Sequence, residues 1–543
     1  MARTEPGTDT DADVVVVGYG PVGMVAAALL GRAGHCVLVL ERYTGLFNLP
    51  RAAIFDDETM RTFARLGVSH ELLPKLHVQR NYEWRNGAGE LLIEHDFAET
   101  GASGWAEWYM MYQPDLDEAL DVAARSAGVE VRHSSPVVAL ADKGTHVALT
   151  VAGPDGRGTV TARSVVACDG GNSFVRSALG VDQEDYGFSE PWMVCDFRFR
   201  RRVGVPPALQ LGDPRHPTSI ISLGPAHHRF SFMLDSPEDF ARESDPDRVW
   251  ARVGAYLGPA DAELIRVATY TFRSLVADRW RVGQVLLAGD AAHQMPPFLG
   301  QGMCSGIRDA QNIAFKLDRV LRGTLPDEAL DTYQVEREPH VRAVIEKGIE
   351  LGRSQTIRDP ERAAERDRVL LARRAARQAP DTIRFPGLHD GLLAARTGAG
   401  RGELSVQGVV QGRVDGRVAR DRLDQVVGGG FHLLVEAGHL TLDDDLLGRL
   451  ASAGVRVVAV AEPDTRVDPP VGWAVTTVID VDGTYHRWFA ELGAVAVAVR
   501  PDFYVFGTAA DAAATTVLAG DLLPALGDAV PGSARPPALT IRA

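Results

Sequence analysis

Short apolar runs that end at a glycine or an acidic residue mark the first part of this chain. Val14–Val17 contains no polar residue and leads into Gly18-Tyr19-Gly20-Pro21-Val22-Gly23, and Cys36–Leu40 ends at Glu41. Such runs are typical of strands buried on both faces of a parallel sheet. Met24–Leu30 lies between them and suits a helix packed on that sheet. The pattern therefore predicts a Rossmann-like strand–helix–strand unit.

The glycine spacing gives this unit a phosphate-binding chemistry. Gly18 permits a tight turn, Gly20 lets the backbone approach a pyrophosphate, and Gly23 allows close contact between helix and strand. The N-terminus of the following helix offers free N–H groups and the positive end of its dipole. Glu41 lies where an acid accepts from ribose hydroxyls. The unit is expected to bind the adenosine diphosphate part of FAD or NAD.

Two later apolar runs end in the same way. Ala162–Cys168 leads into Asp169-Gly170-Gly171, and a short helix that stops at Gly180 follows. Val285–Ala288 leads into Gly289-Asp290. An acid at the end of such a strand can bond ribityl hydroxyls or lie near a pyrophosphate. The alternative for Asp290 is a purely structural role as a helix N-cap.

A glycine-rich loop, Met295–Gly302, comes next, and a helix with apolar residues at three- and four-residue steps follows from Ile307 to Leu321. Glycine and proline in this loop suit close backbone approach to a flat ring. The helix N-terminus would face the loop and stabilise the negative charge of a reduced flavin. His293 is a tempting catalytic residue here, although packing or a backbone hydrogen bond is the more common use of such a histidine.

A second, largely antiparallel sheet is predicted from Trp192–Arg200, Ser219–Leu223 and Arg229–Asp235. In the last run Phe230 and Phe232 alternate with polar neighbours, so one face would roof a substrate cavity. These aromatic residues could equally belong to a core. Beyond a Gly/Pro-rich linker, short apolar strands at Phe431–Val435, Val455–Val460, Ala474–Ile479 and Val495–Val499 alternate with helices at Leu442–Ala453 and Ala509–Leu518, which indicates a small α/β domain.

Together these segments resemble the FAD-dependent aromatic hydroxylases, the group A flavoprotein monooxygenases, and among them the 3-(3-hydroxyphenyl)propionate and polyketide-tailoring hydroxylases. Further matching residues are Pro50-Arg51-Ala52, Asp56-Asp57-Glu58-Thr59 and Gln113-Pro114. The resemblance implies a glutathione-reductase-type FAD domain, an inserted antiparallel substrate domain and a C-terminal thioredoxin-like domain without a C-x-x-C pair. The implied divisions are a disordered tail (1–12), FAD-binding parts (13–185 and 281–355), a substrate sheet (186–280), a helical linker (356–402) and the C-terminal domain (403–543).

The resemblance also implies the reaction. Bound FAD, reduced by NADH or NADPH, would react with O2, and its C4a-hydroperoxide would hydroxylate a phenol or an aromatic polyketide. No protein nucleophile is required, since the cofactor carries the chemistry. The protein must exclude water and orient the ring. Two alternatives stay open: a Baeyer–Villiger or epoxidising oxygenase of the same fold, and a poorly catalytic FAD-binding stabiliser.

The expected site residues fall into three groups. The catalytic candidates are Pro297, Phe298 and His293. The substrate candidates are Tyr112, Phe230, Phe232, Pro296 and Phe298. The expected FAD contacts are Gly18, Gly20, Pro21, Val22, Gly23, Glu41, Arg42, Arg51, Gln113, Asp169, Gly170, Gly289, Asp290, Pro297, Gly300, Gly302 and Met303.

The composition of the chain argues against several classes of binding partner. The chain has 543 residues and a net charge of −15, which argues against nucleic acid or an anionic membrane. Its N-terminus does not have the pattern of a signal peptide, and no apolar run approaches the length of a membrane span. A cytoplasmic monomer or homodimer is expected. The cysteines show no metal-binding or C-x-x-C spacing, so no metal is expected; they are Cys36, Cys168, Cys195 and Cys304.

Overall fold

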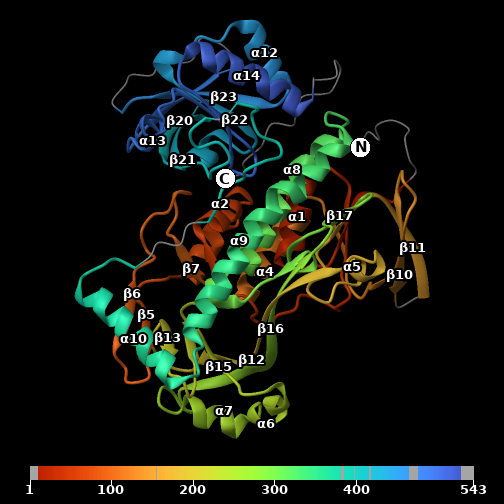
Figure 1. Cartoon of the computed structure of the whole chain (residues 1–543). Helices are drawn as coiled ribbons and strands as arrows, with labels where there is room; N and C mark the ends of the chain where they lie inside the picture. Colours follow the sequence, from red (N-terminus) through yellow and green to blue (C-terminus); the bar gives the residue numbers. More distant parts are fainter. Residues whose placement is uncertain are drawn as a thin grey trace. The chain divides into compact units, whose positions relative to one another are not determined.

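The computed structural model describes residues 10–153, 156–380, 385–396, 398–414, 417–463 and 475–527. The chain divides into two compact units (Figure 1). Unit 1 contains Met1–Ala314 and Tyr333–Pro386, and unit 2 contains Phe315–Thr332 and Gly387–Ala543. Most of the predicted 1–12 tail and the end of the predicted C-terminal domain lie outside the described residues.

The predicted Rossmann-like unit forms the centre of the first sheet of unit 1. Strand β1 pairs in parallel with both β2 and β11, and β11 pairs in parallel with β18. All three runs that were predicted to end at cofactor segments therefore lie side by side. The described strands of this sheet are β1 (Ala12–Val17), β2 (Val37–Leu40), β8 (Glu130–Arg132), β9 (Val137–Asp142), β10 (Val147–Gly153), β11 (Gly156–Ala167), β17 (Arg281–Val282) and β18 (Val285–Leu287).

The second sheet of unit 1 is antiparallel apart from one parallel pair, β5 with β13. Its strand order is β19-β16-β12-β15-β14-β13-β5-β6. The bounds are β5 (Tyr82–Asn86), β6 (Leu91–His95), β12 (Gln183–Phe199), β13 (Ala208–Gly212), β14 (Thr218–Ser222), β15 (His227–Met233), β16 (Ala262–Ala277) and β19 (His293–Gln294). A small third sheet joins β3 (Ile54–Asp56), β4 (His77–Val78) and β7 (Trp108–Met110).

Helices cover these sheets in unit 1. Helix α7 buries Val249 and Val253 in the same apolar cluster as Phe230 of β15, and Figure 1 shows α6 and α7 along β12 and β15. Helix α9 continues through Pro339. The bounds are α1 (Pro21–Arg32), α2 (Asp57–Arg65), α3 (Ser69–Leu72), α4 (Gln113–Ser126), α5 (Phe174–Ala178), α6 (Phe240–Glu243), α7 (Pro246–Val253), α8 (Gln301–Leu321), α9 (Thr332–Gln355) and α10 (Pro360–Ala375).

Unit 2 has a sheet of its own with helices on both faces. Leu450 of α12 and Leu522 of α14 pack on one face, and Trp488 and Phe489 of α13 pack on the other. The described strand order is β21-β20-β24-β23-β22-β25-β26. The bounds are β20 (Val409–Val414), β21 (Arg417–Arg422), β22 (Phe431–Glu436), β23 (Val455–Ala461), β24 (Val475–Asp480), β25 (Ala496–Val499), β26 (Val505–Ala509), α11 (Leu423–Val427), α12 (Asp444–Ser452), α13 (Thr484–Leu492) and α14 (Ala512–Leu526). The small α/β domain is as predicted, and its thioredoxin-like character stays a prediction.

Candidate functional site

The turn between β1 and α1 requires glycine at two of its three predicted positions for internal reasons. Gly18 has a φ of 97°, and a Cβ there would lie 2.5 Å from the carbonyl oxygen of Cys168. A Cβ on Gly23 would lie 2.2 Å from the carbonyl oxygen of Gly18. Both contacts involve backbone atoms, which cannot move aside cheaply. These two glycines let β1, α1 and the second segment meet.

Gly20 differs from its neighbours, because a Cβ there would meet no atom within 4 Å. It is the N-cap of α1, and the first turn of that helix, beginning at Pro21 and Val22, contains no acidic residue. The positive end of the helix dipole therefore faces open space beside a backbone without a side chain. This is the cradle that a pyrophosphate of FAD would fill, and the residues fit that group.

Glu41 is buried at the end of β2 and fixes the same turn. Its Oε2 accepts from the N–H of Tyr19 at 2.7 Å, and its Oε1 accepts from the N–H of Tyr43 at 2.9 Å. Arg42 is exposed, and its guanidinium lies 4.9 Å from the ring centroid of Tyr43. The structure thus gives Glu41 a role in holding the glycine turn, and its contact with a ribose stays a prediction.

The second segment is organised around Asp169. Its Oδ1 accepts from the Ser173 hydroxyl at 2.5 Å and its Oδ2 accepts from the N–H of Val175 at 3.1 Å, so the carboxylate caps α5. Arg176, which the sequence did not single out, donates to the carbonyl of Gly171 at 2.9 Å and to that of Ala291 at 3.0 Å. This guanidinium ties the second segment to the third. Gly170 has a φ of 83° in the turn between them.

Small residues bring α1 and α8 together at the third segment. Gly289 has a φ of 58°, and a Cβ there would lie 3.2 Å from a methyl group of Val22. A Cβ on Gly306 of α8 would lie 2.5 Å from the same methyl group and 3.0 Å from the Cα of Gly289. The N-terminal ends of two helices thus converge on one strand end. Two positive dipole ends favour a ligand that carries negative charge at both places.

Asp290 and Arg51 mark the open side of this convergence. Asp290 is exposed to solvent, yet the surrounding protein atoms raise the pKa of its carboxyl, and the charge of Arg51 counteracts this only in part. A group that is both accessible and surrounded by protein lies on a concave surface. Arg51 is also exposed, with its guanidinium 3.9 Å from the ring centroid of Phe47. Their contact with the cofactor stays a prediction.

The backbone of Arg51 is held from two sides. The Oε1 atom of Gln113 accepts from the N–H of Arg51 at 3.1 Å and from that of Ala52 at 2.7 Å. Arg229 of β15 donates to the carbonyl of Arg51 at 2.6 Å and pairs with Asp196, with its Nε 2.6 Å from Oδ1. Gln113 was predicted to contact FAD directly. Its side-chain carbonyl is instead occupied in positioning the Arg51 loop.

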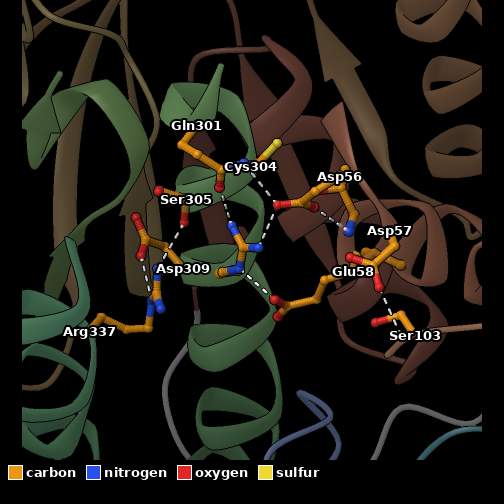
Figure 2. A network of polar contacts seen from close by, with 12 residues as sticks. Asp56, Asp57, Glu58, Ser103, Gln301, Cys304, Ser305, Asp309 and Arg337 are labelled. Atoms are coloured by element: carbon orange, nitrogen blue, oxygen red, sulfur yellow. Dashed lines mark hydrogen bonds and ion pairs between the residues drawn. The ribbon is translucent and has the colours of Figure 1, made fainter. Parts of the chain in front are cut away.

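A buried polar network supports the first turns of α8 (Figure 2). Arg308 donates to Asp56 at 2.5 Å, to Glu58 at 2.6 Å and to Gln301 at 2.9 Å. Burial would raise the pKa of Asp56, but the ion pair with Arg308 holds it below its usual value. The network anchors Gln301, the first residue of α8, and hence the segment Gly302–Met303 that was predicted to contact the flavin.

His293 belongs to the support of this site. It is 1% exposed, and its Nε2 lies 2.6 Å from Oδ2 of Asp309. Asp309 also accepts from the N–H of Gly289 at 3.1 Å and, on Oδ1, from Arg337 at 3.0 Å. The weak prediction of a catalytic histidine is therefore corrected, because a buried ring bonded to a buried carboxylate cannot reach a substrate. We assign His293 to the positioning of Gly289.

The loop before α8 places the remaining predicted residues. Pro296 is buried, Pro297 is exposed and Phe298 is half-buried. The ring of Phe298 lies edge-on to Trp192 of β12, with 5.8 Å between centroids. Gly300 has a φ of 62° and would collide with Ile54 if it carried a Cβ. The loop therefore contacts the second sheet at Trp192 and lies against the third sheet at Ile54.

The predicted substrate residues are not brought together. Phe230 and Phe232 are 0% and 6% exposed and belong to the cluster under α7, so they face the core of the second sheet. Assigning them to the substrate was wrong, because periodicity shows that one face is apolar but not which face is covered by helices. Tyr112 stacks on His227 at 3.8 Å between centroids.

The opposite face of the same strands is only partly covered. Ser231 and Met233 of β15, together with Ser219 and Ile221 of β14, are half-buried, although both strands lie in the middle of the sheet. Their neighbours in sequence, among them Ile220, fill the core. This open face begins beside the Arg229–Arg51 contact. It was not predicted from the sequence, because small residues at alternate positions carry no chemical signal of their own.

Within the described residues, no helix has the length and apolarity to cross a membrane. No group of three or more His, Cys, Asp or Glu side chains in that part of the chain is placed to hold a metal ion.

Comparison with known proteins identifies the family. A model of the FAD binding domain matches residues 11–348, and one of the HcaD C-terminal domain matches residues 402–522. The chain belongs to the FAD binding domain family. This confirms the resemblance to the FAD-dependent aromatic hydroxylases.

Two curated relatives and one solved structure cover almost the whole chain. It is 47% identical to the probable NADH-specific resorcinol 4-hydroxylase of Rhodococcus jostii (strain RHA1), with 98% of each protein covered. It is 33% identical to the 3-(3-hydroxy-phenyl)propionate/3-hydroxycinnamic acid hydroxylase of Mycobacterium sp. (strain JLS), covering 92% of this chain and 89% of the relative. The structure of aklavinone-11 hydroxylase with FAD and aklavinone is 25% identical with a TM-score of 0.75, covering 96% of this chain and 100% of that one.

Proposed function

We propose that this protein is a FAD-dependent monooxygenase that uses NADH and O2 to hydroxylate a phenolic ring. The observation that carries the proposal is the convergence of α1 and α8 at Val22, Gly289 and Gly306, with the Gly20 backbone left open beside them. The relative that is 47% identical is named an NADH-specific resorcinol 4-hydroxylase, which supports both the reductant and the reaction.

Two segments of the chain would bind the two ends of FAD. The turn at Gly18, Gly20 and Gly23 would hold the pyrophosphate of FAD, and the first turn of α8 would lie against the flavin ring at Gly302 and Met303. When bound, the flavin would accept a hydride from NADH and activate O2 for transfer of one oxygen atom to the ring. The side chains would orient the substrate and exclude water.

Arg51 and Asp290 would meet the cofactor between these two helix ends. The exposed guanidinium of Arg51 offers several donors to phosphate or ribityl oxygens. Asp290 is an acceptor on the same concave surface, and its raised pKa reflects the protein atoms around it. Asp169 is occupied as a helix cap, so its contribution to the cofactor would come through the position of Gly170 and Gly171.

The test begins with the visible spectrum of the purified protein and with NADH oxidation in air against a panel of phenols and aromatic polyketides. We expect flavin bands, oxidation stimulated by a phenol, and a product that is about 16 mass units heavier, the mass of one oxygen atom. A ring-expanded product would favour Baeyer–Villiger chemistry. Bound flavin whose reaction with NADH is stimulated by none of the phenols would favour a binding protein. Failure to bind FAD would contradict the proposal.

A further inference from the structure

We propose that the open face of the second sheet binds an uncharged aromatic ring with two hydroxyl groups, and that Ser219 and Ser231 recognise its second hydroxyl. This inference rests on the proposed function and names its substrate class. The open face is the side of β12, β14, β15 and β16 that points away from the cluster under α7.

The open face lies between the two segments that were predicted to reach the flavin. On β12 and β15, Asp196 pairs with Arg229, Val194 with Ser231, and Trp192 with Met233. Arg229 contacts the Arg51 loop, and Trp192 contacts Phe298 in the loop before α8. Residues two apart on a strand are separated by about 7 Å. Ser231 therefore lies midway between these two contacts.

A row of small side chains crosses the sheet at this level. In register, Gln210 of β13 pairs with Ser219, Ser219 with Ser231, Ser231 with Val194, and Val194 with Ala268. Bulky side chains flank the row, with Arg229 and Arg266 on one side and Trp192 and Met233 on the other. Ser219, Ser231 and Ala268 are half-buried in spite of their central position. Small side chains between bulky ones leave room above the row for one flat ring.

Three polar groups along this row have unused hydrogen-bonding capacity. The hydroxyls of Ser219 and Ser231 bond to none of the residues that the structure describes. Gln210 is 4% exposed, and its Nε2 has no hydrogen-bond partner in the same part of the chain. A buried amide donor without a partner costs free energy unless a ligand or water satisfies it. An amide donor and two hydroxyls together match a phenolic hydroxyl, which both donates and accepts.

The charges around the row select against a carboxylate. The row itself contains no cation, and the nearest arginines are occupied. All three guanidinium nitrogens of Arg229 bond to Asp196, Pro50 or Arg51. Arg266 bonds to Asp196, to the carbonyl of Pro50 and to the Tyr270 hydroxyl. A substrate carboxylate on this face would lose its hydration without gaining an ion pair.

The other end of the row carries a carboxyl group. Glu190, two residues before Trp192 on β12, accepts from the Thr356 hydroxyl at 2.8 Å and from Nε1 of Trp192 at 3.3 Å. Burial raises the pKa of this carboxyl, against the opposing charges of Arg358 and Arg353, so the selection against a substrate carboxylate comes from the occupied guanidinium groups of Arg229 and Arg266. Trp192 also stacks on Phe272, with 5.9 Å between centroids, and supplies an aromatic wall. The surroundings therefore favour resorcinol-like rings over phenols that carry an acid side chain.

The test measures binding to the FAD-loaded protein by calorimetry and by quenching of tryptophan fluorescence, without NADH. Two ligand pairs isolate the two claims: resorcinol against phenol for the second hydroxyl, and 3-(3-hydroxyphenyl)propionate against its amide for the charge. We expect resorcinol to bind more tightly than phenol, and the amide more tightly than the acid. Ser219→Ala and Ser231→Ala should each weaken resorcinol binding about 3- to 10-fold, as for loss of one hydrogen bond.

The double variant should bind resorcinol and phenol with similar affinity. Ser189→Ala, at an exposed position of β12, is the matched control and should change neither affinity. Tighter binding of the acid than of its amide, or an unchanged preference for resorcinol in the double variant, would overturn this inference. Such a result would leave the proposed function standing, since that function fails if FAD does not bind, if no phenol stimulates NADH oxidation, or if the product is ring-expanded.

Discussion

The Nη1 atom of Arg229 donates to the carbonyl oxygen of Arg51 at 2.6 Å. The two residues are 178 positions apart in sequence, one on the second sheet of unit 1 and the other in the loop near Asp290. Because Gln113 holds the N–H of Arg51 from the opposite side, the peptide of this loop is fixed at both polar atoms. The second sheet therefore helps to position the loop that carries Arg51, a predicted cofactor residue.

Arg229→Met should weaken FAD binding by about tenfold or more, equivalent to about 1.4 kcal/mol, because the Arg51 loop loses one of its two anchors. The measurement is the dissociation constant of FAD by flavin fluorescence, with circular dichroism to establish folding. Arg198→Met on the neighbouring strand is the control, since Arg198 is exposed and its ion pair among the described residues is with Glu263. Unchanged FAD affinity in a folded Arg229→Met protein would show that the anchor is dispensable.

Two glycine substitutions separate folding from cofactor binding. Gly18→Ala should destabilise the protein by more than about 2 kcal/mol, because its Cβ would strike the Cys168 carbonyl at a positive φ. Gly20→Ala should change stability by less than about 0.5 kcal/mol, since its Cβ enters open space, yet it should weaken FAD binding. Urea unfolding without FAD and FAD titration give the two readouts. Equal effects of both substitutions on both readouts would contradict this division.

His293→Gln should keep kcat within about tenfold of the parent enzyme while lowering the midpoint of thermal unfolding, because the ring supports Asp309 and does not face a substrate. Loss of a general acid or base typically lowers the rate by about 10²- to 10⁴-fold. Turnover at saturating FAD and substrate, measured beside a melting curve, distinguishes the two roles. A hundredfold loss of kcat in a fully flavin-loaded variant would indicate that His293 acts in catalysis.

Asp117 should make stability depend on pH. Burial raises the pKa of Asp117 to about 7 from 3.8, against the opposing effects of its Gln113 hydrogen bond and of Arg51. Its carboxyl is thus neutral in the fold at low pH, and stability is lost as pH rises toward 7. Asp117→Asn removes this loss. The free energy of unfolding of the variant relative to the parent should therefore rise by about 2 to 3 kcal/mol between pH 5 and pH 8.

Urea unfolding across that range provides the measurement for Asp117. Glu118→Gln, at the exposed next position of α4, is the matched control and should show no such trend. If the free energies of unfolding of Asp117→Asn and the parent protein changed with pH in parallel, burial would not raise the pKa of Asp117.

The sequence by itself determined the parts of the site that depend on neighbouring residues. A buried strand, a glycine turn and a helix follow one another within Val14–Leu30, so hydrophobic periodicity and glycine spacing were sufficient to predict them. The same local logic predicted the strands that end at Asp169 and Asp290. In the parallel sheet these strands are neighbours or next neighbours, which brings their ends together.

Only the tertiary structure decided the features that depend on residues far apart in the chain. Alternation along β15 was evident, but whether Phe230 or Ser231 faced the core depended on the position of α7. The hydrogen bond from Arg229 to Arg51 and the ion pairs of Arg308 join residues from separate elements. The sequence around an arginine does not identify the carboxylate with which it pairs. Local periodicity fixes secondary structure, whereas long-range packing determines which face of an element is left for chemistry.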